Sequence, residues 1–339
     1  MKRVQIDPDI RKAKTLPSDF YTSQTYFDLA KERIFGRTWQ FVGNAGDVNN
    51  LKPVTLLEGL LDEPLLITRQ GLKLSCMSNV CTHRGMILVD KPCEGDRIRC
   101  GYHGRRFNLD GTFVSMPEFE GVEDFPSDAD NLQSVALNKW NTFLFASLEP
   151  VSPFEAFVAG SEFAVNETDA AKLSLVSTRD YEVKAHWALY CENYLEGFHI
   201  PYVHKSLNEV VDYGTYSTET FRYSSMQTGF DSNGEIAGRY FFMFPNTMLN
   251  FYPWGISMNI VRPINADKSV VSFLTYVLDE TKLGGGAGAD LHRVEMEDEK
   301  IVESVQKGIR SRFYTHGRYS PTRETGTHHF HRLIAEFME

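Results

Sequence analysis

The chain has 339 residues, five cysteines and a formal net charge of −10, and 42% of its residues are hydrophobic. This length predicts two domains, and the apolar content excludes a disordered or fibrous protein. The acidic balance argues against nucleic acid and anionic lipid as partners, because both require a basic surface. No window of about 18 apolar residues occurs. We therefore expect a cytoplasmic protein with no membrane partner.

The first half of the chain is predicted to form a small all-β domain at residues 38–154. Within it, residues 60–81 and 139–150 alternate apolar runs with short polar or glycine turns, which is the pattern of antiparallel strands. Residues 155–339 are predicted to form a second domain of α+β class. We expect the N-terminal residues 1–37 to pack on that second domain.

The second domain combines strands with two predicted helices, at residues 186–199 and 292–312. Its strand-like segments are STRDYEVKAHW, MLNFYPWGISMNIVRP and SVVSFLTYVLDE. The glycine-rich stretch 283–290 is predicted to be a loop before a helix, because no GK[ST] sequence accompanies it as in a phosphate-binding loop.

Four metal-ligand side chains lie on a short polar hairpin, as Cys81-x-His83 and Cys100-x-x-His103. Two thiolates and two imidazoles match an asymmetric [2Fe–2S] cluster, in which one iron binds both cysteines and the other binds both histidines. Structural zinc is the alternative, but zinc fingers usually keep like ligands together. Ordinary turn residues are the least favoured interpretation, because cysteine is rare and all four side chains are of the required type. The hairpin resembles the Rieske domain.

The hairpin differs from the usual Rieske text at a few positions. Gly101 stands where proline is common and Arg105 where tryptophan is common, which leaves the ligands unchanged but alters the local packing. Met86 and Tyr102 stand where the Rieske proteins of respiratory complexes have the cysteines of an extra disulfide. The sequence therefore resembles the oxygenase and ferredoxin branch.

A second candidate metal site follows in the second domain. His199 and His204 flank Pro201, which tends to stop or kink a helix, so we expect His199 to end a helix and His204 to fold back toward it. A lone pair of histidines is more often structural than metal-binding. Asp298, however, lies within an apolar stripe at helical spacing, and an inward carboxylate must be paired, protonated or bound to a cation. The stripe consists of Val294, Ile301, Val302, Val305 and Ile309, with Glu295, Glu297, Glu299 and Glu303 at its edges or outside it.

Together, His199, His204 and Asp298 match the 2-His-1-carboxylate ligand set of non-haem Fe(II) oxygenases, which leaves positions open for O2. The hairpin, ENYLEGFHIPYVH, FPNTMLNFYPWG and the acidic helix resemble, in this order and over nearly the full length, the large subunits of Rieske non-haem iron oxygenases. The resemblance implies an all-β Rieske [2Fe–2S] domain, a helix-grip-type catalytic domain with an antiparallel sheet, and a homotrimer.

The candidate catalytic residues are Asn193 and Glu196. The resemblance implies that Glu196 bridges the mononuclear iron site to a Rieske histidine of the adjacent subunit. On a helix, a residue three positions before His199 would share its face, which suits this role. The alternative is a buried glutamate that forms a local salt bridge.

The predicted function is an oxygenase component that hydroxylates or oxidatively demethylates a small organic substrate with O2. Its electrons would come from a separate NAD(P)H-dependent reductase or ferredoxin, because the chain has no dinucleotide-binding fingerprint. Two alternatives stay open: the alpha subunit of an aromatic-ring-hydroxylating dioxygenase, and a Rieske electron-transfer protein without catalytic iron.

The aromatic residues of the segment 198–254 bear on the substrate. They can form a cage for a quaternary ammonium group, although most are expected to be core residues of the sheet. Glu196 and FPNTMLNFYPWG resemble choline- and carnitine-type monooxygenases more than arene dioxygenases. A quaternary ammonium compound is therefore the favoured substrate class. The aromatic set is Phe198, Tyr202, Tyr213, Tyr216, Phe230, Tyr240, Phe241, Phe242, Phe244, Phe251, Tyr252 and Trp254.

Three histidines near the C-terminus, His328, His329 and His331, are predicted to be structural or surface residues, because no cysteine or acidic motif accompanies them.

Overall fold

The chain folds into two compact units in the computed structural model. The smaller unit is residues 36–151, and the larger unit joins residues 1–35 to residues 152–339. The model describes residues 3–167, 172–204, 214–282 and 291–339. The predicted glycine-rich loop at 283–290 therefore lies outside the described residues. Antiparallel sheets and helices together make the protein α+β, as the sequence predicted.

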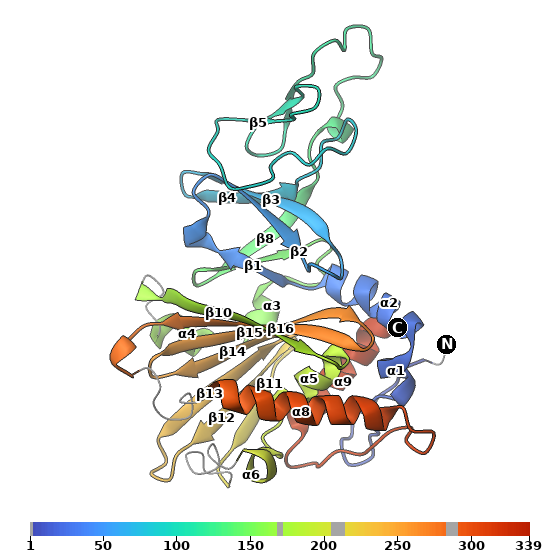
Figure 1. The fold of residues 1–339 in the computed structure, drawn as a ribbon, viewed down its shortest axis with the longest axis vertical. Helices are drawn as coiled ribbons and strands as arrows, with labels where there is room; N and C mark the ends of the chain where they lie inside the picture. The colour runs from blue at the N-terminus through green and yellow to red at the C-terminus, as the bar shows by residue number, and fades with distance from the viewer. Residues whose placement is uncertain (1–2, 168–171, 205–213, 283–290) are drawn as a thin grey trace. The chain divides into compact units, whose positions relative to one another are not determined.

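The smaller unit is built from antiparallel strands (Figure 1). Six strands form one sheet in the order β1-β9-β8-β4-β3-β2, and the short strands β5, β6 and β7 form a second sheet. The predicted segment 60–81 becomes the hairpin β3–β4, and the strand predicted within 139–150 is β9, which pairs with the preceding strand β8. The strands are β1 (Gln40–Asn44), β2 (Leu51–Leu56), β3 (Glu63–Gln70), β4 (Lys73–Ser78), β5 (Ile98–Arg99), β6 (Arg106–Phe107), β7 (Phe113–Ser115), β8 (Ser134–Trp140) and β9 (Phe143–Ser147).

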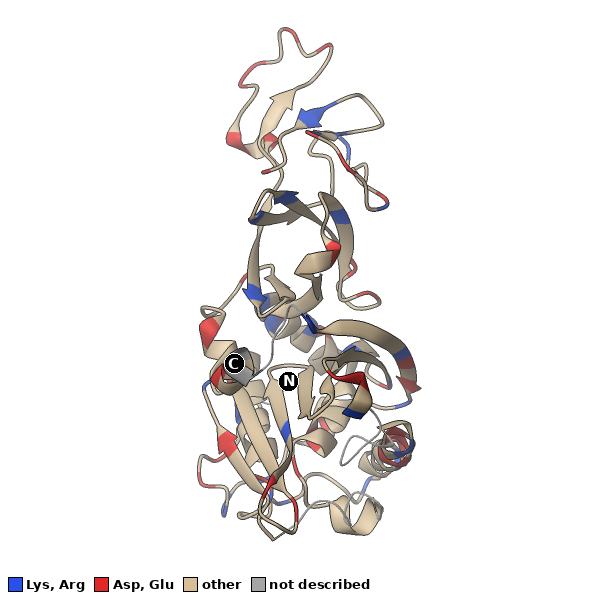
Figure 2. Cartoon of the chain, turned by 90° about the vertical axis from the view of Figure 1, so that its left-hand side faces the viewer, with Lys and Arg blue, Asp and Glu red and all other residues tan. Residues whose placement is uncertain are grey.

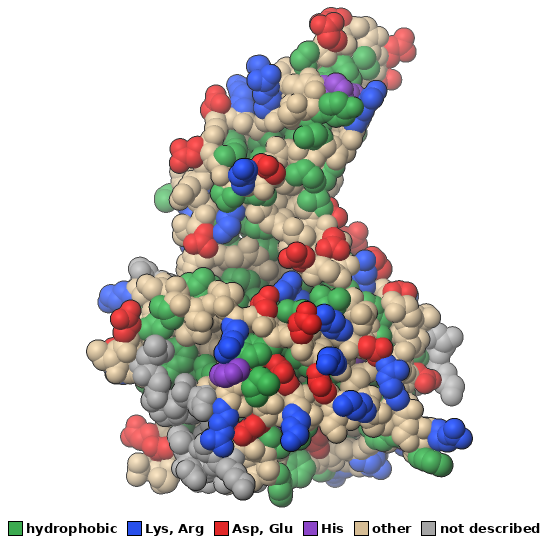
Figure 3. Space-filling model, viewed as in Figure 1, with side chains coloured by type: hydrophobic (Ala, Val, Ile, Leu, Met, Phe, Trp, Pro, Cys, Tyr) green, Lys and Arg blue, Asp and Glu red, His purple; other side chains and the backbone are tan. Residues whose placement is uncertain are grey.

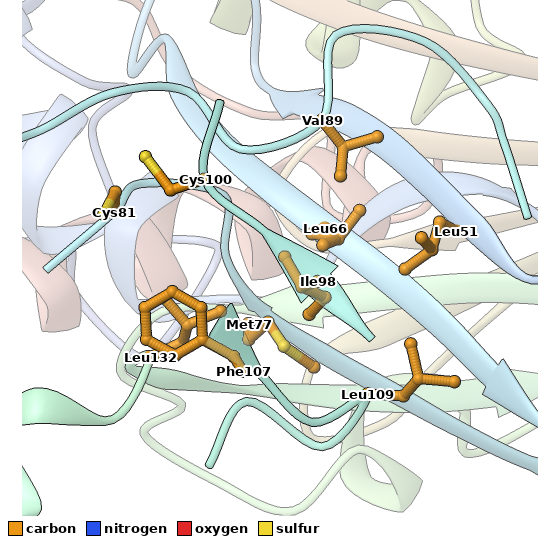
Figure 4. Close-up of a cluster of buried hydrophobic side chains, with 10 residues drawn as sticks. All are labelled: Leu51, Leu66, Met77, Cys81, Val89, Ile98, Cys100, Phe107, Leu109 and Leu132. Carbon is orange, nitrogen blue, oxygen red and sulfur yellow. The ribbon is translucent and has the colours of Figure 1, made fainter. Parts of the chain in front are cut away.

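Ten buried side chains form a hydrophobic cluster in the smaller unit (Figure 4). Cys81 and Cys100 belong to this cluster, and each is only 2% exposed. The two cysteine loops are therefore anchored to the core by the residues that the hairpin pattern singled out. The cluster consists of Leu51, Leu66, Met77, Cys81, Val89, Ile98, Cys100, Phe107, Leu109 and Leu132.

Arg105, which replaces a common tryptophan, is 2% exposed and occupies an aromatic pocket. Its guanidinium lies 4.7 Å from the ring centroid of Phe113 and 5.6 Å from those of Phe107 and Phe125. The charge is paired, because Arg105 Nη2 lies 2.6 Å from Asp130 Oδ1. A planar guanidinium stacks on aromatic rings much as an indole would, so the substitution keeps the aromatic packing and adds a buried ion pair.

The larger unit contains a seven-stranded antiparallel sheet in the order β10-β16-β15-β14-β13-β12-β11 (Figure 1). Tyr240 pairs with Asn250, and Asn259 pairs with Phe273. Side chains of paired residues lie on the same face of a sheet, so these four positions can build one wall of a site. The strands are β10 (Ser174–Val183), β11 (Ser217–Thr220), β12 (Ser224–Phe230), β13 (Ile236–Met243), β14 (Thr247–Tyr252), β15 (Gly255–Asn265) and β16 (Lys268–Val277).

Helices complete the larger unit. The C-terminal helix α9 buries Phe330, Leu333, Ile334 and Phe337, an i, i+3, i+4, i+7 pattern that marks one helical face. Burial of each such side chain stabilises the fold by about 1.5–3 kcal/mol. The helices are α1 (Ser18–Thr22), α2 (Gln24–Arg33), α3 (Glu155–Val158), α4 (Glu162–Glu167), α5 (Trp187–Tyr194), α6 (Ile200–Val203), α8 (Leu291–Ile309) and α9 (Thr325–Met338).

The C-terminal histidines have structural contacts. His331 is fully buried, with Nδ1 at 2.6 Å from the Tyr319 hydroxyl and Nε2 at 3.0 Å from Glu192 Oε1. His328 Nε2 lies 2.8 Å from the backbone oxygen of Asp7. These contacts agree with a structural role for both residues.

Helix α8 follows the predicted helix closely, but its buried face differs from the predicted apolar stripe. Ile301 and Val305 are 38% and 42% exposed, whereas Glu295 and Gln306 are buried. These two polar side chains can be buried because each has a hydrogen-bond partner. Glu295 Oε2 accepts a hydrogen bond from the Tyr190 hydroxyl, and Gln306 Oε1 accepts one from the backbone N–H of His186. The prediction that Glu295 lies at the edge of the buried stripe or outside it was therefore wrong.

Charged residues of both signs are interspersed along both units (Figure 2). Arg293, Lys300 and Lys307 on α8 are exposed. Figure 3 shows basic and acidic side chains intermixed on the face of the larger unit that is in view. Of the helices that the structure describes, none is both long and apolar enough to cross a lipid bilayer.

We expect Asp130→Asn to destabilise the smaller unit by about 2 kcal/mol, because it leaves the buried Arg105 charge without its counter-ion. This value lies below that for a fully buried pair because the Asp130 side chain is 18% exposed and asparagine can still accept a hydrogen bond. The measurement is unfolding by denaturant, monitored through the absorbance of the predicted [2Fe–2S] cluster. Asp128→Asn, in the same exposed turn, is the matched control and should change stability by less than about 0.5 kcal/mol. Equal effects of both substitutions would contradict the account.

Candidate metal centres and active site

The two ligand loops of the smaller unit fold alike. The carbonyl of Cys81 accepts a hydrogen bond from Gly85 N at 3.0 Å, and the carbonyl of Cys100 accepts one from Gly104 N at 3.1 Å. Both glycines have positive φ, 71° and 75°, a backbone conformation that side chains disfavour. The backbone conformation of each loop thus explains why a glycine follows each cysteine after four residues.

The four predicted ligands form a cysteine pair and a histidine pair. Cys81 and Cys100 interact through their side chains, and they lie next to each other in Figure 4. The ring centroids of His83 and His103 are 4.8 Å apart. A cysteine pair and a separate histidine pair fit a [2Fe–2S] cluster, in which one iron would take both cysteines and the other both histidines, better than one tetrahedral zinc ion.

In the larger unit, His199, His204 and Asp298 converge on one point. One ligand atom from each lies within 4.8 Å of the other two, and no other group of three His, Cys, Asp or Glu residues in the described part of the chain meets this condition. Asp298 Oδ1 lies 3.0 Å from His204 Nε2 and 3.6 Å from His199 Nε2. Two imidazoles and one carboxylate on one side of a metal suit Fe(II) and leave coordination positions free.

Both histidines have a second carboxylate on the opposite ring nitrogen. His199 Nδ1 lies 2.7 Å from Glu196 Oε1, and His204 Nδ1 lies 2.8 Å from Glu297 Oε2. An Nδ1–H that donates to a carboxylate fixes the tautomer and leaves the Nε2 lone pair available to a metal. The sequence did not single out Glu297 as a partner of His204, because the two residues are far apart in the chain.

The surroundings of His204 favour positive charge at this position. Its side chain is 1% exposed, and burial alone would lower its pKa. The carboxylates of Asp298 and Glu297 outweigh burial and raise the pKa above the ordinary histidine value. A divalent cation that binds at Nε2 would supply the positive charge that these carboxylates stabilise.

The local path of the chain differs from the prediction. Helix α5 ends at Tyr194, and His199 is the N-cap residue of the short helix α6. Proline is favourable in the first helical turn, so Pro201 helps to start α6 and does not terminate a longer helix. The expected helix at 186–199 is therefore too long, and His199 begins a helix that His204 ends.

Glu196 accordingly contacts His199 through a turn. Glu196 Oε2 accepts hydrogen bonds from the backbone N–H groups of Phe198 and His199. A Cβ at Gly197 would lie 2.9 Å from the Tyr216 ring, so a side chain at this position would disturb the turn or the ring.

A cavity of about 110 Å³ opens beside the triad. This volume is small compared with the range of about 300–1,000 Å³ for drug-sized ligands, and it favours a small substrate. Both candidate catalytic residues, Asn193 and Glu196, line the cavity. Among the residues that the structure describes, the lining consists of Tyr190, Asn193, Tyr194, Glu196, His199, Ile200, His204, Tyr216, Tyr240, Asn250, Tyr252, Asn259, Phe273, Leu291, Val294, Glu295 and Asp298.

The predicted aromatic set divides between cavity, core and surface. Tyr216, Tyr240 and Tyr252 line the cavity, whereas Tyr202 is 78% exposed and Tyr213 lies outside the described residues. Other members, Phe241, Phe242, Phe244 and Trp254 among them, are buried in the core. Sequence reasoning missed Tyr190, Tyr194, Phe273 and Glu295, which come from outside the aromatic segment and reach the cavity through strand pairing and helix packing.

Two family models match the chain. Residues 38–126 match the Rieske [2Fe-2S] domain, and residues 218–339 match the catalytic domain of the ring hydroxylating alpha subunit. The second match includes Asp298 and begins after His204.

Known proteins resemble the chain over almost its whole length. A chloroplastic choline monooxygenase of Arabidopsis thaliana is 31% identical over 97% of this chain and 85% of its own length. The carnitine monooxygenase oxygenase subunit of Escherichia coli K12 is 28% identical over 96% of this chain and 94% of its own.

Solved structures share the fold. A quaternary ammonium Rieske monooxygenase in complex with L-carnitine has a TM-score of 0.79 and 26% identity, covering 98% of this chain and 97% of that chain. A naphthalene 1,2-dioxygenase has a TM-score of 0.72 at 16% identity, covering 96% and 92%, which shows a shared fold.

We expect Asp298→Ala to remove the mononuclear iron and to leave the [2Fe–2S] absorbance intact, because the carboxylate lies nearest to both Nε2 atoms. Wild-type protein should contain about three irons and two acid-labile sulfides per chain, and the variant about two of each.

Glu297→Ala is the matched control on the same helix. It should weaken iron binding by about 10- to 100-fold, because it removes only the partner of His204 Nδ1. Iron and sulfide analysis after dialysis distinguishes the two variants. If Glu297→Ala abolishes iron binding and Asp298→Ala does not, the ligand assignment is wrong.

Proposed function

The chain belongs to the Rieske non-haem iron oxygenases, and from this premise we propose that it is the oxygenase component acting on a small quaternary ammonium compound. Members of this family are oxidoreductases that incorporate oxygen from O2, and they use a Rieske [2Fe–2S] cluster and a mononuclear iron. The aromatic-dioxygenase alternative is weaker, because its structural relatives are only 16% identical to this chain.

The observation that carries the proposal is the position of the triad beside a cavity with tyrosine walls. Tyr216, Tyr240 and Tyr252 share the cavity with His199, His204 and Asp298. Aromatic rings attract a quaternary ammonium group through their negative faces, by about 0.5–2 kcal/mol for each well-placed ring. The resemblance to choline and carnitine monooxygenases supports the same substrate class.

The side chains fit the two metal groups of the family. In our proposal Cys81 and Cys100 hold one iron of the cluster, His83 and His103 hold the other, and His199, His204 and Asp298 hold the mononuclear iron. When bound, these groups supply electrons singly and activate O2. The residues around them would position the metals: Glu196 and Glu297 fix the imidazoles, and the burial of both cysteines would keep their side of the cluster away from water.

The overall reaction replaces one C–H bond next to the ammonium nitrogen by C–OH. One oxygen atom of O2 enters the product and the other leaves as water, which consumes two electrons and two protons. If the oxidised carbon is an N-methyl group, the hydroxymethyl product releases formaldehyde and a proton and leaves a tertiary amine. The electrons come, in this proposal, from a separate NAD(P)H-dependent reductase or ferredoxin.

Glu196 is the proposed link between the mononuclear iron and the cluster of an adjacent subunit. Its Oε2 accepts two local hydrogen bonds, from the backbone N–H groups of Phe198 and His199, whereas Oε1 accepts one, from His199 Nδ1, and retains a further lone pair. A second donor on that lone pair would connect two metal centres. A cyclic homotrimer would repeat this contact at each interface. Inter-subunit electron transfer is described for a quaternary ammonium Rieske monooxygenase of similar fold.

Substrate-dependent consumption of NADH and O2 in the presence of a surrogate reductase tests the substrate class. Choline, carnitine and other trimethylammonium compounds should stimulate consumption coupled to product, whereas naphthalene and similar arenes should not. Coupled turnover of arenes alone would overturn the proposal in favour of a ring-hydroxylating dioxygenase. Cluster reduction without turnover of either class would indicate an electron-transfer protein.

Glu196→Gln should retain both metal centres and the oligomer, yet slow electron transfer from the reduced cluster to the iron by at least about tenfold, because the amide cannot accept a hydrogen bond at both of its ends. Rapid mixing of pre-reduced, iron-loaded protein with O2 and substrate gives this rate. Glu297→Gln, which alters the partner of the other histidine, is the control and should transfer electrons normally once iron is bound. Normal transfer in Glu196→Gln, or a monomeric active wild type, removes the bridging role.

A further inference from the structure

The cavity beside the triad contains a carboxylate that the metal site does not use. Glu295 lines this cavity and is 3% exposed. It lies three residues before Asp298 on α8, so the two side chains share a face of the helix with about 5–6 Å between their Cβ atoms. A group held by Glu295 would therefore lie next to the mononuclear iron site.

The hydrogen bonds of Glu295 are incomplete. Its Oε2 accepts a hydrogen bond from the Tyr190 hydroxyl on α5. Its Oε1 is also buried and has no hydrogen-bond partner among the residues that the structure describes. Buried carboxyl oxygens without partners are costly and uncommon. The hydrogen bond that joins α5 to α8 uses only Oε2. Oε1 is therefore available to a ligand.

The walls around Glu295 are aromatic and neutral. Tyr240 pairs with Asn250 across β13 and β14, and Tyr252 lies two residues further along the same face. The rings of Tyr240 and Tyr216 are stacked with centroids 6.5 Å apart, and those of Tyr240 and Tyr252 are 6.2 Å apart at a steep angle. Burial raises the pKa of each of these tyrosines, which keeps the phenols uncharged.

We propose that Glu295, together with the wall formed by Tyr216, Tyr240 and Tyr252, is the subsite that binds the cationic nitrogen of the substrate. A quaternary ammonium group has no N–H to donate, so it would be recognised by the negative charge of Glu295 and by the ring faces. The cation beside Oε1 would place a carbon attached to nitrogen near Asp298 and the iron. This inference rests on the proposed function and names the residue that sets its substrate class.

The electrostatic surroundings of Glu295 are consistent with a binding site for a cation. Burial, with the neighbouring charges of Asp298 and Glu299, raises the pKa of Glu295, whereas the hydrogen bond from Tyr190 acts in the opposite direction. A fixed positive charge in the cavity offsets the cost of burial and favours the carboxylate form. Burial thus disfavours the charge of Glu295, and a cationic substrate would stabilise it.

Binding of a charged probe and its neutral isostere tests the inference. Choline and 3,3-dimethylbutan-1-ol differ only in the replacement of the ammonium nitrogen by carbon, and calorimetry on iron-loaded, anaerobic protein gives the dissociation constant of each. In Glu295→Gln, the preference for choline should fall by about tenfold or more, because the variant loses the charge and keeps the shape. Glu295→Asp should retain part of the preference.

Glu299→Gln is the matched control, since it neutralises a carboxylate one helical turn away that does not line the cavity. It should leave the preference unchanged. Tyr190→Phe retains the Glu295 charge and removes its hydrogen bond, so it should reduce the preference less than Glu295→Gln. Iron content and cluster absorbance verify that each variant is intact.

The outcomes separate this inference from the proposed function. Wild-type protein that prefers choline, with an equal preference in Glu295→Gln, would overturn the role of Glu295 and leave the substrate class standing. Wild-type protein that binds both probes equally would overturn the proposed substrate class and, with it, the inference.

Discussion

His204 lies between two adjacent carboxylates of one helix, and the rest of the site depends on this arrangement. Nδ1 lies 2.8 Å from Glu297 and Nε2 lies 3.0 Å from Asp298, so both nitrogens of a ring that is 1% exposed have partners. Helix α6 has only four residues, and a helix this short is not stable alone. Its position is therefore set by contacts such as these, which bring α6 and α8 to the same side of the sheet.

The same contacts give the site a negative net charge. Three carboxylates, Glu196, Glu297 and Asp298, face the two histidines. If these three are ionised, a divalent iron leaves a net charge of −1, and a cationic substrate complements that charge without a further protein cation. A neutral arene would gain nothing from this balance. In this account the acidic side chains around the histidines retain the metal, and together with Glu295 they favour a cationic substrate.

The sequence predicted best those features that depend on short spacings. The segments CTHRG and CGYHG contain both the predicted cluster ligands and the glycines that their loops require. The sequence also predicted the triad of His199, His204 and Asp298, whose side chains lie together in the structure. Helix ends were predicted less well, because Pro201 can either stop one helix or start the next, and the structure shows the second.

Features that depend on distant contacts were not predicted. Glu295 was expected at the edge of the apolar stripe or outside it, because its partner, Tyr190, is more than a hundred positions earlier in the chain. Phe273 enters the cavity because β16 pairs with β15 in the register that places it opposite Asn259. Neither contact leaves a local pattern of hydrophobicity, so the binding surface of the cavity could be found only from the fold.

The most direct test of the account is the fate of a reduced cluster when O2 and an ammonium substrate are added together. In iron-loaded wild-type protein that has been reduced and freed of reductant, the account predicts reoxidation of the cluster in step with formation of the hydroxylated or demethylated product. In Asp298→Ala the cluster should stay reduced on the same timescale, and no product should form. Product at the wild-type yield from Asp298→Ala would contradict the claim that His199, His204 and Asp298 form the site at which O2 is used.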